Sequence, residues 1–321
     1  MSNISLSIIV PVYNEESSIT PFLEEIRKNL KDIEKYEIIF CLDPCTDNTE
    51  EIIKKQAEIN KNIKLIVFSR RFGQPAATMA GILNCSGDAC IIIDVDLQDP
   101  PSLIPKLYNK YLEGYDTVLA KRKTREGETI IKKIIAYIGY KIINKISYVE
   151  IPRNTGDFRI ISRKIIEELR LLSEQHGFLR GLNSFIGFEQ AVIEYDRDKR
   201  FTGQGNYNKF TGSIKIGLNG IISFSTAPLS IMLWLGFTIS LIATIGVIYI
   251  LLTKIIMGVD YPTGIPTIII LILFFGGANI MAIGVLGEYI GRIYDEVKQR
   301  PLYIVSKSHN IDIKHKRGFS K

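Results

Sequence analysis

Two aspartates at alternate positions, Asp94 and Asp96, follow the apolar run 89–93 and are the residues best placed to do chemistry in this sequence. Carboxylates in this arrangement can bind a hard divalent cation such as Mg²⁺ or Mn²⁺, and the cation can hold the oxygens of a diphosphate. The simpler alternative is a strand that ends in an acidic turn, because Pro100 and Pro101 block its continuation. Other features of the sequence are needed to distinguish a metal-binding pair from an acidic turn.

Apolar runs and helical patterns alternate in the first part of the chain. Helical spacing occurs at 18–32 and 48–59, and strands are expected at 6–12, 37–42, 63–69 and 89–94. This alternation predicts a Rossmann-like α/β domain with a mainly parallel sheet and helices on both faces. Ligands bind such sheets at the carboxyl ends of the strands. Polar residues follow all four strands, so we expect one binding rim that contains Tyr13, Asn14, Glu15, Asp43, Arg70, Asp94 and Asp96.

Two long segments near the C-terminus, 216–253 and 261–287, contain no charged residue. Each exceeds the roughly 20 apolar residues that a helix needs to cross the hydrocarbon core of a bilayer. We therefore expect a hairpin of two membrane-spanning helices, at about 227–252 and about 262–287. Two buried helices of a soluble protein are the alternative, which the uncharged length disfavours.

The charges around these segments predict an orientation. Residues 292–321 hold eight Lys or Arg and three acidic residues, whereas the connection between the segments carries only Lys254 and Asp260. Excess positive charge favours the cytoplasmic side, so we expect both termini and the N-terminal domain there, in a multi-pass protein of the cytoplasmic membrane. No signal peptide is expected. The net charge of +6 fits an anionic lipid surface, and we find no nucleic-acid recognition motif.

The four cysteines all fall in the domain expected in the cytosol, so disulfides are not expected. Their C-x3-C and C-x4-C spacings fit zinc poorly, and small core residues are the simpler interpretation.

Residues 207–224 mix polar and apolar side chains, which favours an interfacial helix at the lipid headgroups. An ordinary surface helix is the alternative, because glycines weaken the helical pattern. The expected units are therefore a soluble domain (1–206), this amphipathic helix, a membrane hairpin (225–291) and a basic tail (292–321).

Five motifs occur in order along nearly the whole chain. They are Val-Pro-Val-Tyr-Asn-Glu-Glu at 10–16, Ser-Arg-Arg-Phe-Gly at 69–73, Asp-Val-Asp-Leu-Gln-Asp-Pro-Pro at 94–101, Asn-Thr-Gly-Asp-Phe-Arg at 154–159 and Leu-Gly-Glu-Tyr-Ile-Gly-Arg at 286–292. Their order and spacing resemble the polyprenyl-phosphate glycosyltransferases of glycosyltransferase family 2. The bactoprenol glucosyltransferases used in O-antigen glucosylation are the most similar type, and dolichyl-phosphate mannose synthase is related.

The resemblance implies a GT-A domain at 1–206 that binds a nucleoside-diphosphate sugar, with UDP-glucose as the best guess. It places the base and ribose against Pro11, Tyr13, Glu15, Asp43 and Arg70. It also places the diphosphate and a metal, Mg²⁺ or Mn²⁺, on Asp94, Asp96 and Gln98.

On the acceptor side, the resemblance implies inverting transfer to polyprenyl (undecaprenyl) phosphate, for modification of a cell-surface glycan such as lipopolysaccharide. Arg122, after an expected strand at 116–120, would contact phosphate. Asp157 matches the proposed catalytic base, and Arg200 begins a loop on the acceptor side. A turn aspartate and solvated surface arginines are the simpler alternatives. A homotetramer is expected by the same resemblance.

Two departures from the family pattern qualify these expectations. Where many relatives have two aspartates followed by Gly-Ser, this chain has Leu-Asp-Pro-Cys at 42–45, so one carboxylate fewer can contact the base. Where relatives have Gly-x-Ser-Lys-Tyr, it has Gly-Gln-Gly-Asn-Tyr at 203–207. Lys199, Lys209 or backbone amides would then have to bind the lipid phosphate.

The acceptor chemistry leaves the role of Asp157 open between base and orienting group. A phosphate monoester has a second pKa of about 6, so it is mostly ionised at neutral pH and needs no strong base. We favour an orienting role. Transfer of mannose, galactose or an N-acetylhexosamine remains open, because few contacts select the sugar. A processive polysaccharide synthase and a catalytically silent membrane scaffold are further alternatives.

Overall fold

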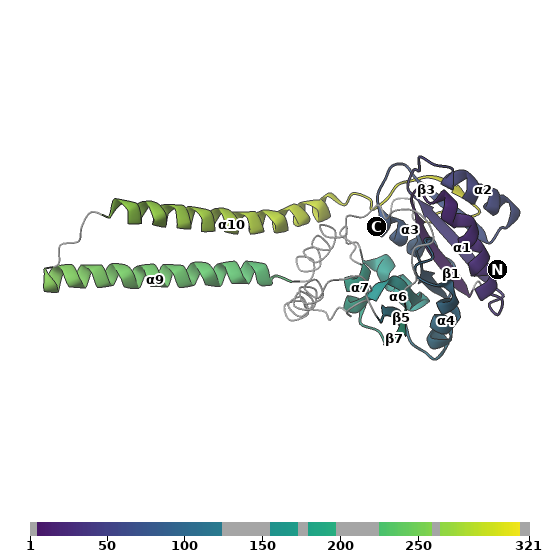
Figure 1. Cartoon of the computed structure of the whole chain (residues 1–321), viewed down its shortest axis with the longest axis horizontal. Coiled ribbons are helices and arrows are strands. Elements are labelled where there is room, and N and C mark those ends of the chain that lie inside the picture. Colours follow the sequence, from purple (N-terminus) through teal and green to yellow (C-terminus); the bar gives the residue numbers. More distant parts are fainter. Residues whose placement is uncertain (1–4, 124–154, 173–178, 197–224, 259–263, 315–321) are drawn as a thin grey trace.

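The computed structural model describes residues 5–123, 155–172, 179–196, 225–258 and 264–314. A sheet with helices on both faces forms one end of the molecule, and two long helices run side by side away from it (Figure 1). The strands are β1 Leu6–Val12, β2 Tyr36–Leu42, β3 Ile63–Phe68, β4 Ala89–Ile92, β5 Thr117–Arg122, β6 Thr155–Ser162, β7 Gln190–Tyr195 and β8 Val305–His309. The helices are α1 Glu16–Asn29, α2 Thr49–Ile59, α3 Gln74–Asn84, α4 Ile104–Leu112, α6 Arg163–Leu171, α7 Leu179–Ile186, α9 Ala227–Met257 and α10 Ile265–Lys298.

The strands form one sheet in the order β7-β5-β6-β4-β1-β2-β3-β8. β1 pairs in parallel with both β2 and β4, and β2 pairs in parallel with β3. β6 runs antiparallel to β4 and β5, and β8 runs antiparallel to β3. The chain builds outward from β1 to β3 and then returns to the other side of β1 as β4. The predicted mainly parallel α/β sheet is confirmed, and its point of reversal lies between β1 and β4.

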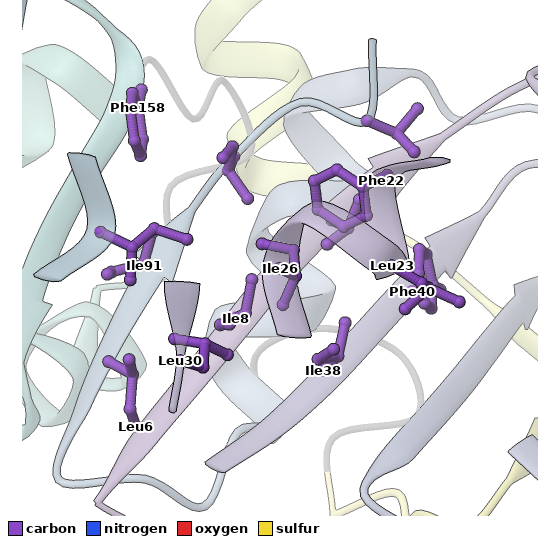
Figure 2. Packing of buried hydrophobic residues seen from close by; sticks show 14 of the residues in the cluster. Leu6, Ile8, Phe22, Leu23, Ile26, Leu30, Ile38, Phe40, Ile91 and Phe158 are labelled. Carbon is purple, nitrogen blue, oxygen red and sulfur yellow. The ribbon is translucent and has the colours of Figure 1, made fainter. Parts of the chain in front are cut away.

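The core lies on both faces of the sheet because successive strand residues point to opposite sides. Leu6 and Ile8 of β1 are fully buried and belong to one cluster with Phe22 and Ile26 of α1 (Figure 2). Ile9, the next residue after Ile8, belongs to the cluster on the opposite face. Helices α1, α2 and α4 cover the first face, and helices α3, α6 and α7 cover the second.

The first five strands and the first two helices lie where the sequence predicts them, with ends that differ by at most three residues. The four cysteines are free thiols; Cys41, Cys85 and Cys90 are buried, and Cys45 is half-buried. All four contribute to the packing of the two core clusters.

Helices α9 and α10 are 31 and 34 residues long, above the roughly 20 that a bilayer crossing needs. Both are long and apolar enough to cross a membrane. Their large apolar side chains point outward; Leu233 and Ile280 are each 73% exposed. Such a surface requires an apolar environment, so these helices associate with a membrane. The candidate interfacial helix at 207–224 lies outside the described residues, and the expected domain boundaries remain a prediction.

The C-terminal segment differs from the expected basic tail. Helix α10 continues past residue 287 to Lys298, and β8 then adds to the sheet beside β3. Tyr303, between the two, is fully buried. The sequence gives little sign of this strand because β8 lies at the sheet edge and three of its five residues are exposed.

Candidate active site

The loops after β1 and β4 flank the point where the strand order reverses, which is where open α/β sheets bind ligands. Tyr13 follows β1 directly, and Asp94 and Asp96 follow β4. All three side chains are half-buried, whereas Pro11 lies buried within β1, opposite Cys41 of β2. The expected rim therefore forms at the expected edge of the sheet.

Asp43 holds the loop between β3 and α3. Its Oδ1 accepts a hydrogen bond from the Phe72 amide at 2.8 Å, and its Oδ2 accepts one from the Gly73 amide at 3.0 Å. Gly73 has a φ of +88°, which only glycine adopts without strain, and its carbonyl begins the hydrogen bonding of α3. The Asp43 side chain is buried, so in this conformation it orders the loop; contact with a base remains a prediction.

Two arginines of this loop lie on aromatic rings. The guanidinium carbon of Arg70 is 4.0 Å from the ring centroid of Phe72, and that of Arg71 is 4.0 Å from the ring centroid of Tyr13. Cation–π contacts of this kind restrict long flexible side chains while leaving N–H donors available. Both arginines are exposed on the rim, where they can meet an anionic ligand. The sequence singled out Arg70 but not Arg71.

The loops after β1 and β2 are tied together by side chains. Asn14, with a φ of +53°, donates from Nδ2 to Thr46 Oγ1 at 3.1 Å and accepts from the Thr46 amide at 2.9 Å. The Glu15 amide donates to Thr49 Oγ1 at 3.0 Å, and Glu15 Oε2 accepts from Ser18 Oγ at 2.9 Å. These bonds order the backbone that directly follows Tyr13.

The aspartate pair stands in a tightly turned loop. Gln74, the first residue of α3, donates from Nε2 to Asp94 Oδ1 at 2.9 Å. Asp96 Oδ1 accepts from the Gln98 amide at 3.1 Å. Leu97 between them has a φ of +59°, a conformation that is rare for a non-glycine residue and is concentrated at functional sites.

The donor set fits a Mg²⁺ or Mn²⁺ ion shared with a substrate. Within the described residues, no group of three or more His, Cys, Asp or Glu side chains could form a closed metal cage. Two carboxylates, with the side-chain oxygen of Gln98 available on the same loop, leave coordination positions for diphosphate oxygens and water. Mg²⁺ usually binds to nucleotides in this way.

Arg122 lies in a buried polar cluster that the sequence did not predict. Its Nε donates to the Tyr195 hydroxyl oxygen at 3.2 Å, and its Nη2 lies 3.5 Å from Asp99 Oδ1. The Tyr195 hydroxyl itself donates to Asp99 Oδ1. Burial, followed by the neighbouring Asp99 charge, raises the pKa of Tyr195 well above its ordinary value, so this donor stays protonated. Asp99 and Tyr195 thus fix the orientation of Arg122.

Asp157 lies on β6 beside a buried arginine. Its Oδ1 is 4.0 Å from Nη2 of Arg159, which is 1% exposed and donates to the Gly156 carbonyl at 2.7 Å. The Asp157 side chain is one-third exposed, so one edge is open to a ligand. Arg159 therefore forms a long ion pair with the Asp157 carboxylate.

Sequence reasoning found the residues of the rim but not those that support them. Arg200 lies outside the described residues. The supporting residues that were not predicted from the sequence are Arg71, Gln74, Asp99, Arg159 and Tyr195. Asp99 lies within the quoted motif at 94–101, and its position before two prolines is the one signal that could have drawn attention to it. The individual roles of all these residues remain predictions.

A comparison with protein families matches residues 7–170, about half of the chain, to "Glycosyl transferase family 2". The chain belongs to this family. An uncharacterized glycosyltransferase of Synechocystis, sll0501, is 41% identical over 304 residues, which cover 94% of this chain and 95% of the relative. The bactoprenol glucosyl transferase from prophage SfII of Shigella flexneri is 41% identical over 306 residues, which cover 95% and 98%. YkcC of Bacillus subtilis, an uncharacterized glycosyltransferase, is 40% identical over 313 residues, or 97% and 96%.

Family membership identifies this chain as a glycosyltransferase, and the sheet with the helices on its two faces has the mainly parallel α/β architecture expected of its GT-A domain. The matches extend beyond the sheet into α9 and α10, because they cover more than nine-tenths of the chain. The expected family is confirmed.

Proposed function

We propose that this enzyme transfers a glucosyl residue from UDP-glucose to undecaprenyl phosphate, with inversion at the anomeric carbon. The observation that carries the proposal is the 41% identity to a bactoprenol glucosyl transferase over both the sheet and the apolar helices. The sheet can bind a soluble donor, and the apolar helices can bring it to a lipid acceptor.

On the donor side, Asp94 and Asp96 would hold Mg²⁺ or Mn²⁺, with Gln98 as a further oxygen ligand. The ion would neutralise the charge that develops on the departing diphosphate. Arg70 and Arg71 reach the same rim and can contact phosphate or ribose oxygens. The contact of Arg71 with Tyr13 keeps this ring in place as a platform for the base.

On the acceptor side, Arg122 would bind the lipid phosphate or the leaving diphosphate. A guanidinium suits this task because it presents several donors in a rigid plane, and Asp99 and Tyr195 restrict its movement. The acceptor phosphate is mostly ionised at neutral pH. Asp157 therefore acts in this proposal as an orienting group: through its pairing with Arg159 it would hold the acceptor site in position for attack on the anomeric carbon.

Helices α9 and α10 would bring the rim to the bilayer surface. In this proposal both cross the cytoplasmic membrane, and the sheet and both termini lie in the cytoplasm, because the segment after α10 is basic. The isoprenoid chain of the acceptor then stays in the bilayer while its phosphate meets the rim. The lipid-linked sugar would serve modification of a cell-surface glycan.

A screen of nucleotide sugars tests the donor. The full chain in detergent would be incubated with undecaprenyl phosphate, Mn²⁺ and one of UDP-glucose, UDP-galactose, UDP-N-acetylglucosamine or GDP-mannose, and the lipid product would be weighed by mass spectrometry. We expect a hexosyl lipid monophosphate from UDP-glucose. Product from another donor alone would replace glucose in the proposal, and no product from any donor would refute it.

A further inference from the structure

The segment after α10 runs along the edge of the sheet, next to the loop between β3 and α3. We call this loop, residues 69–73, the donor loop. We call residues 302–314 the C-terminal strap. The strap begins beside the loop, where the Ser69 amide donates to the Ile304 carbonyl at 2.9 Å. It continues as β8 along β3, and then Asn310 donates from Nδ2 to the carbonyl of Ile63 at 2.9 Å. The strap therefore follows the whole length of β3, including the end that carries the loop.

Tyr303 connects the strap to the loop through a series of tilted and edge-to-face ring contacts. It is fully buried, and its ring centroid lies 5.6 Å from that of Phe68, the last residue of β3. The Phe68 ring lies 6.0 Å from the ring of Phe72, which carries the Arg70 guanidinium. Any displacement of Tyr303 is thus transmitted by direct contact to the loop that Asp43 holds from its other side.

Asn84 fixes the strap to the far end of α3. This side chain is buried, donates from Nδ2 to the Tyr303 hydroxyl oxygen at 3.0 Å and accepts from the Lys314 amide at 3.1 Å. Helix α3 starts at the loop and contributes Gln74 to the aspartate pair. The strap consequently holds both ends of one unit, the loop at 69–73 and helix α3, which carries donor-site residues at its start.

We propose that the strap is a positioning element of the donor site, with Tyr303 and Asn84 as its positioning residues. It sets the affinity for the nucleotide by fixing the loop at 69–73 and the first turn of α3. This inference rests on the proposed function for the identity of the ligand. If the strap sets the affinity for the nucleotide, donor binding depends on the segment that follows α10. Residues 299–301 alone separate the end of α10 from the strap.

A purely structural role is the competing explanation. A strand that merely covers the β3 edge would stabilise the sheet, and its loss would lower the melting temperature (Tm) without changing the affinity of the folded enzyme for nucleotide. The two explanations differ in the dissociation constant of the nucleotide and in the mobility of the loop, both measured on folded protein.

The experiment uses the full chain in detergent with the variants Tyr303→Leu, Tyr303→Phe and Ser308→Ala. Leucine keeps the side chain apolar but removes the ring and part of its volume. Phenylalanine removes only the bond to Asn84, and Ser308 is an exposed residue of β8. The readouts are the dissociation constant of UDP with Mn²⁺, from calorimetry, and hydrogen exchange of the amides at 69–84.

We expect Tyr303→Leu to weaken UDP binding about tenfold, equal to about 1.4 kcal/mol, and to speed exchange at the Phe72 and Gly73 amides. Tyr303→Phe, which loses the bond to Asn84, should bind UDP nearly as wild type does but exchange somewhat faster at 69–84. Ser308→Ala should match wild type in both readouts. Unchanged UDP affinity and unchanged exchange in folded Tyr303→Leu would overturn the proposal. If that variant does not fold, slower or equal exchange at 69–84 in Tyr303→Phe overturns it and faster exchange supports it. If wild type does not bind UDP, the proposed donor is wrong, and exchange alone decides on the strap.

Discussion

Gly156 lies against the guanidinium of Arg122 so closely that a Cβ atom on residue 156 would stand 3.0 Å from Arg122 Nη2. That distance is too short for an undisturbed contact, so an alanine would shift the guanidinium by a few tenths of an ångström relative to Asp99 and Tyr195. The Asn-Thr-Gly-Asp-Phe-Arg motif thus has a steric reason for its glycine. It lets strand β6 pass beside an arginine that β5 carries into the site.

Gly156→Ala should lower the transfer rate by about tenfold to a hundredfold, because small misplacements of a charged group are costly in a preorganised site. The fold should survive, since the displaced atom is the end of a flexible side chain. The same substitution at Gly246 in α9, where a Cβ would meet nothing within 4 Å, is the matched control. Equal rates for the two variants would remove Arg122 from the proposed mechanism.

Asp43→Asn should destabilise the donor loop. Asparagine keeps one acceptor oxygen but turns an NH₂ group towards the amide of Phe72 or Gly73, so one buried hydrogen bond is lost. We expect a loss of about 1 to 3 kcal/mol in the free energy of unfolding and a higher KM for the donor. Denaturant unfolding and donor kinetics would check this. The exposed Asp32, changed in the same way, should leave both quantities unaltered.

Much of the fold follows from the sequence because the inner strands are continuous apolar runs. The residues Leu6–Val12 are all buried, and a strand buried on both faces has a strong local signal. Strand β8 has no such signal, since three of its five residues are exposed and its partner β3 lies more than two hundred residues earlier. The formation of such an edge strand depends on its pairing with a partner that is distant in the sequence.

The candidate site likewise contains residues that the sequence predicts and residues that it does not. The rim residues follow strands, so strand prediction alone brings Tyr13, Asp43 and Asp94 to one edge. The supporting residues come from elements that sequence spacing cannot relate. Tyr195 at the end of β7 meets Asp99 because β7 pairs with β5, a register that only the folded sheet defines.

Asp157→Asn distinguishes orientation from proton removal. If Asp157 orients the acceptor, kcat should fall by a similar factor at every pH, since asparagine cannot pair with the Arg159 charge. If Asp157 removes a proton, the loss should disappear well above pH 7, where an acceptor with a second pKa of about 6 is already ionised. We expect the first pattern. A loss confined to low pH would assign Asp157 the role of base.

Tyr195→Phe should change the alkaline stability of the protein. The pKa of Tyr195 is raised by burial and by Asp99, so above about pH 10 the unfolded chain releases this proton while the folded chain keeps it. The free energy of unfolding then falls with rising pH, by at most about 1.4 kcal/mol per pH unit for this group. Phenylalanine has no ionisable hydroxyl, so Tyr195→Phe lacks this contribution to the pH dependence.

The slope of Tm against pH above about pH 10 should therefore be shallower in Tyr195→Phe than in wild type. Tyr303 and Cys41, whose pKa values burial also raises, are present in both proteins and cancel in the difference. Parallel slopes would mean that Tyr195 is not held protonated by its surroundings. The comparison requires only thermal melts in one detergent over a series of buffers.

The central claim is metal-dependent transfer of a sugar to a lipid phosphate at the rim that Asp94 and Asp96 occupy. Its most direct test is transfer of radiolabelled glucose from UDP-glucose, in vesicles that hold the full chain with either undecaprenyl phosphate or undecaprenol. We predict labelled lipid only with the phosphate, abolition by a chelator, recovery on addition of Mn²⁺ or Mg²⁺, and at least a hundredfold loss in Asp96→Asn, a magnitude of about 3 kcal/mol. Labelled lipid from undecaprenol, or full activity with chelator or in Asp96→Asn, would contradict the account.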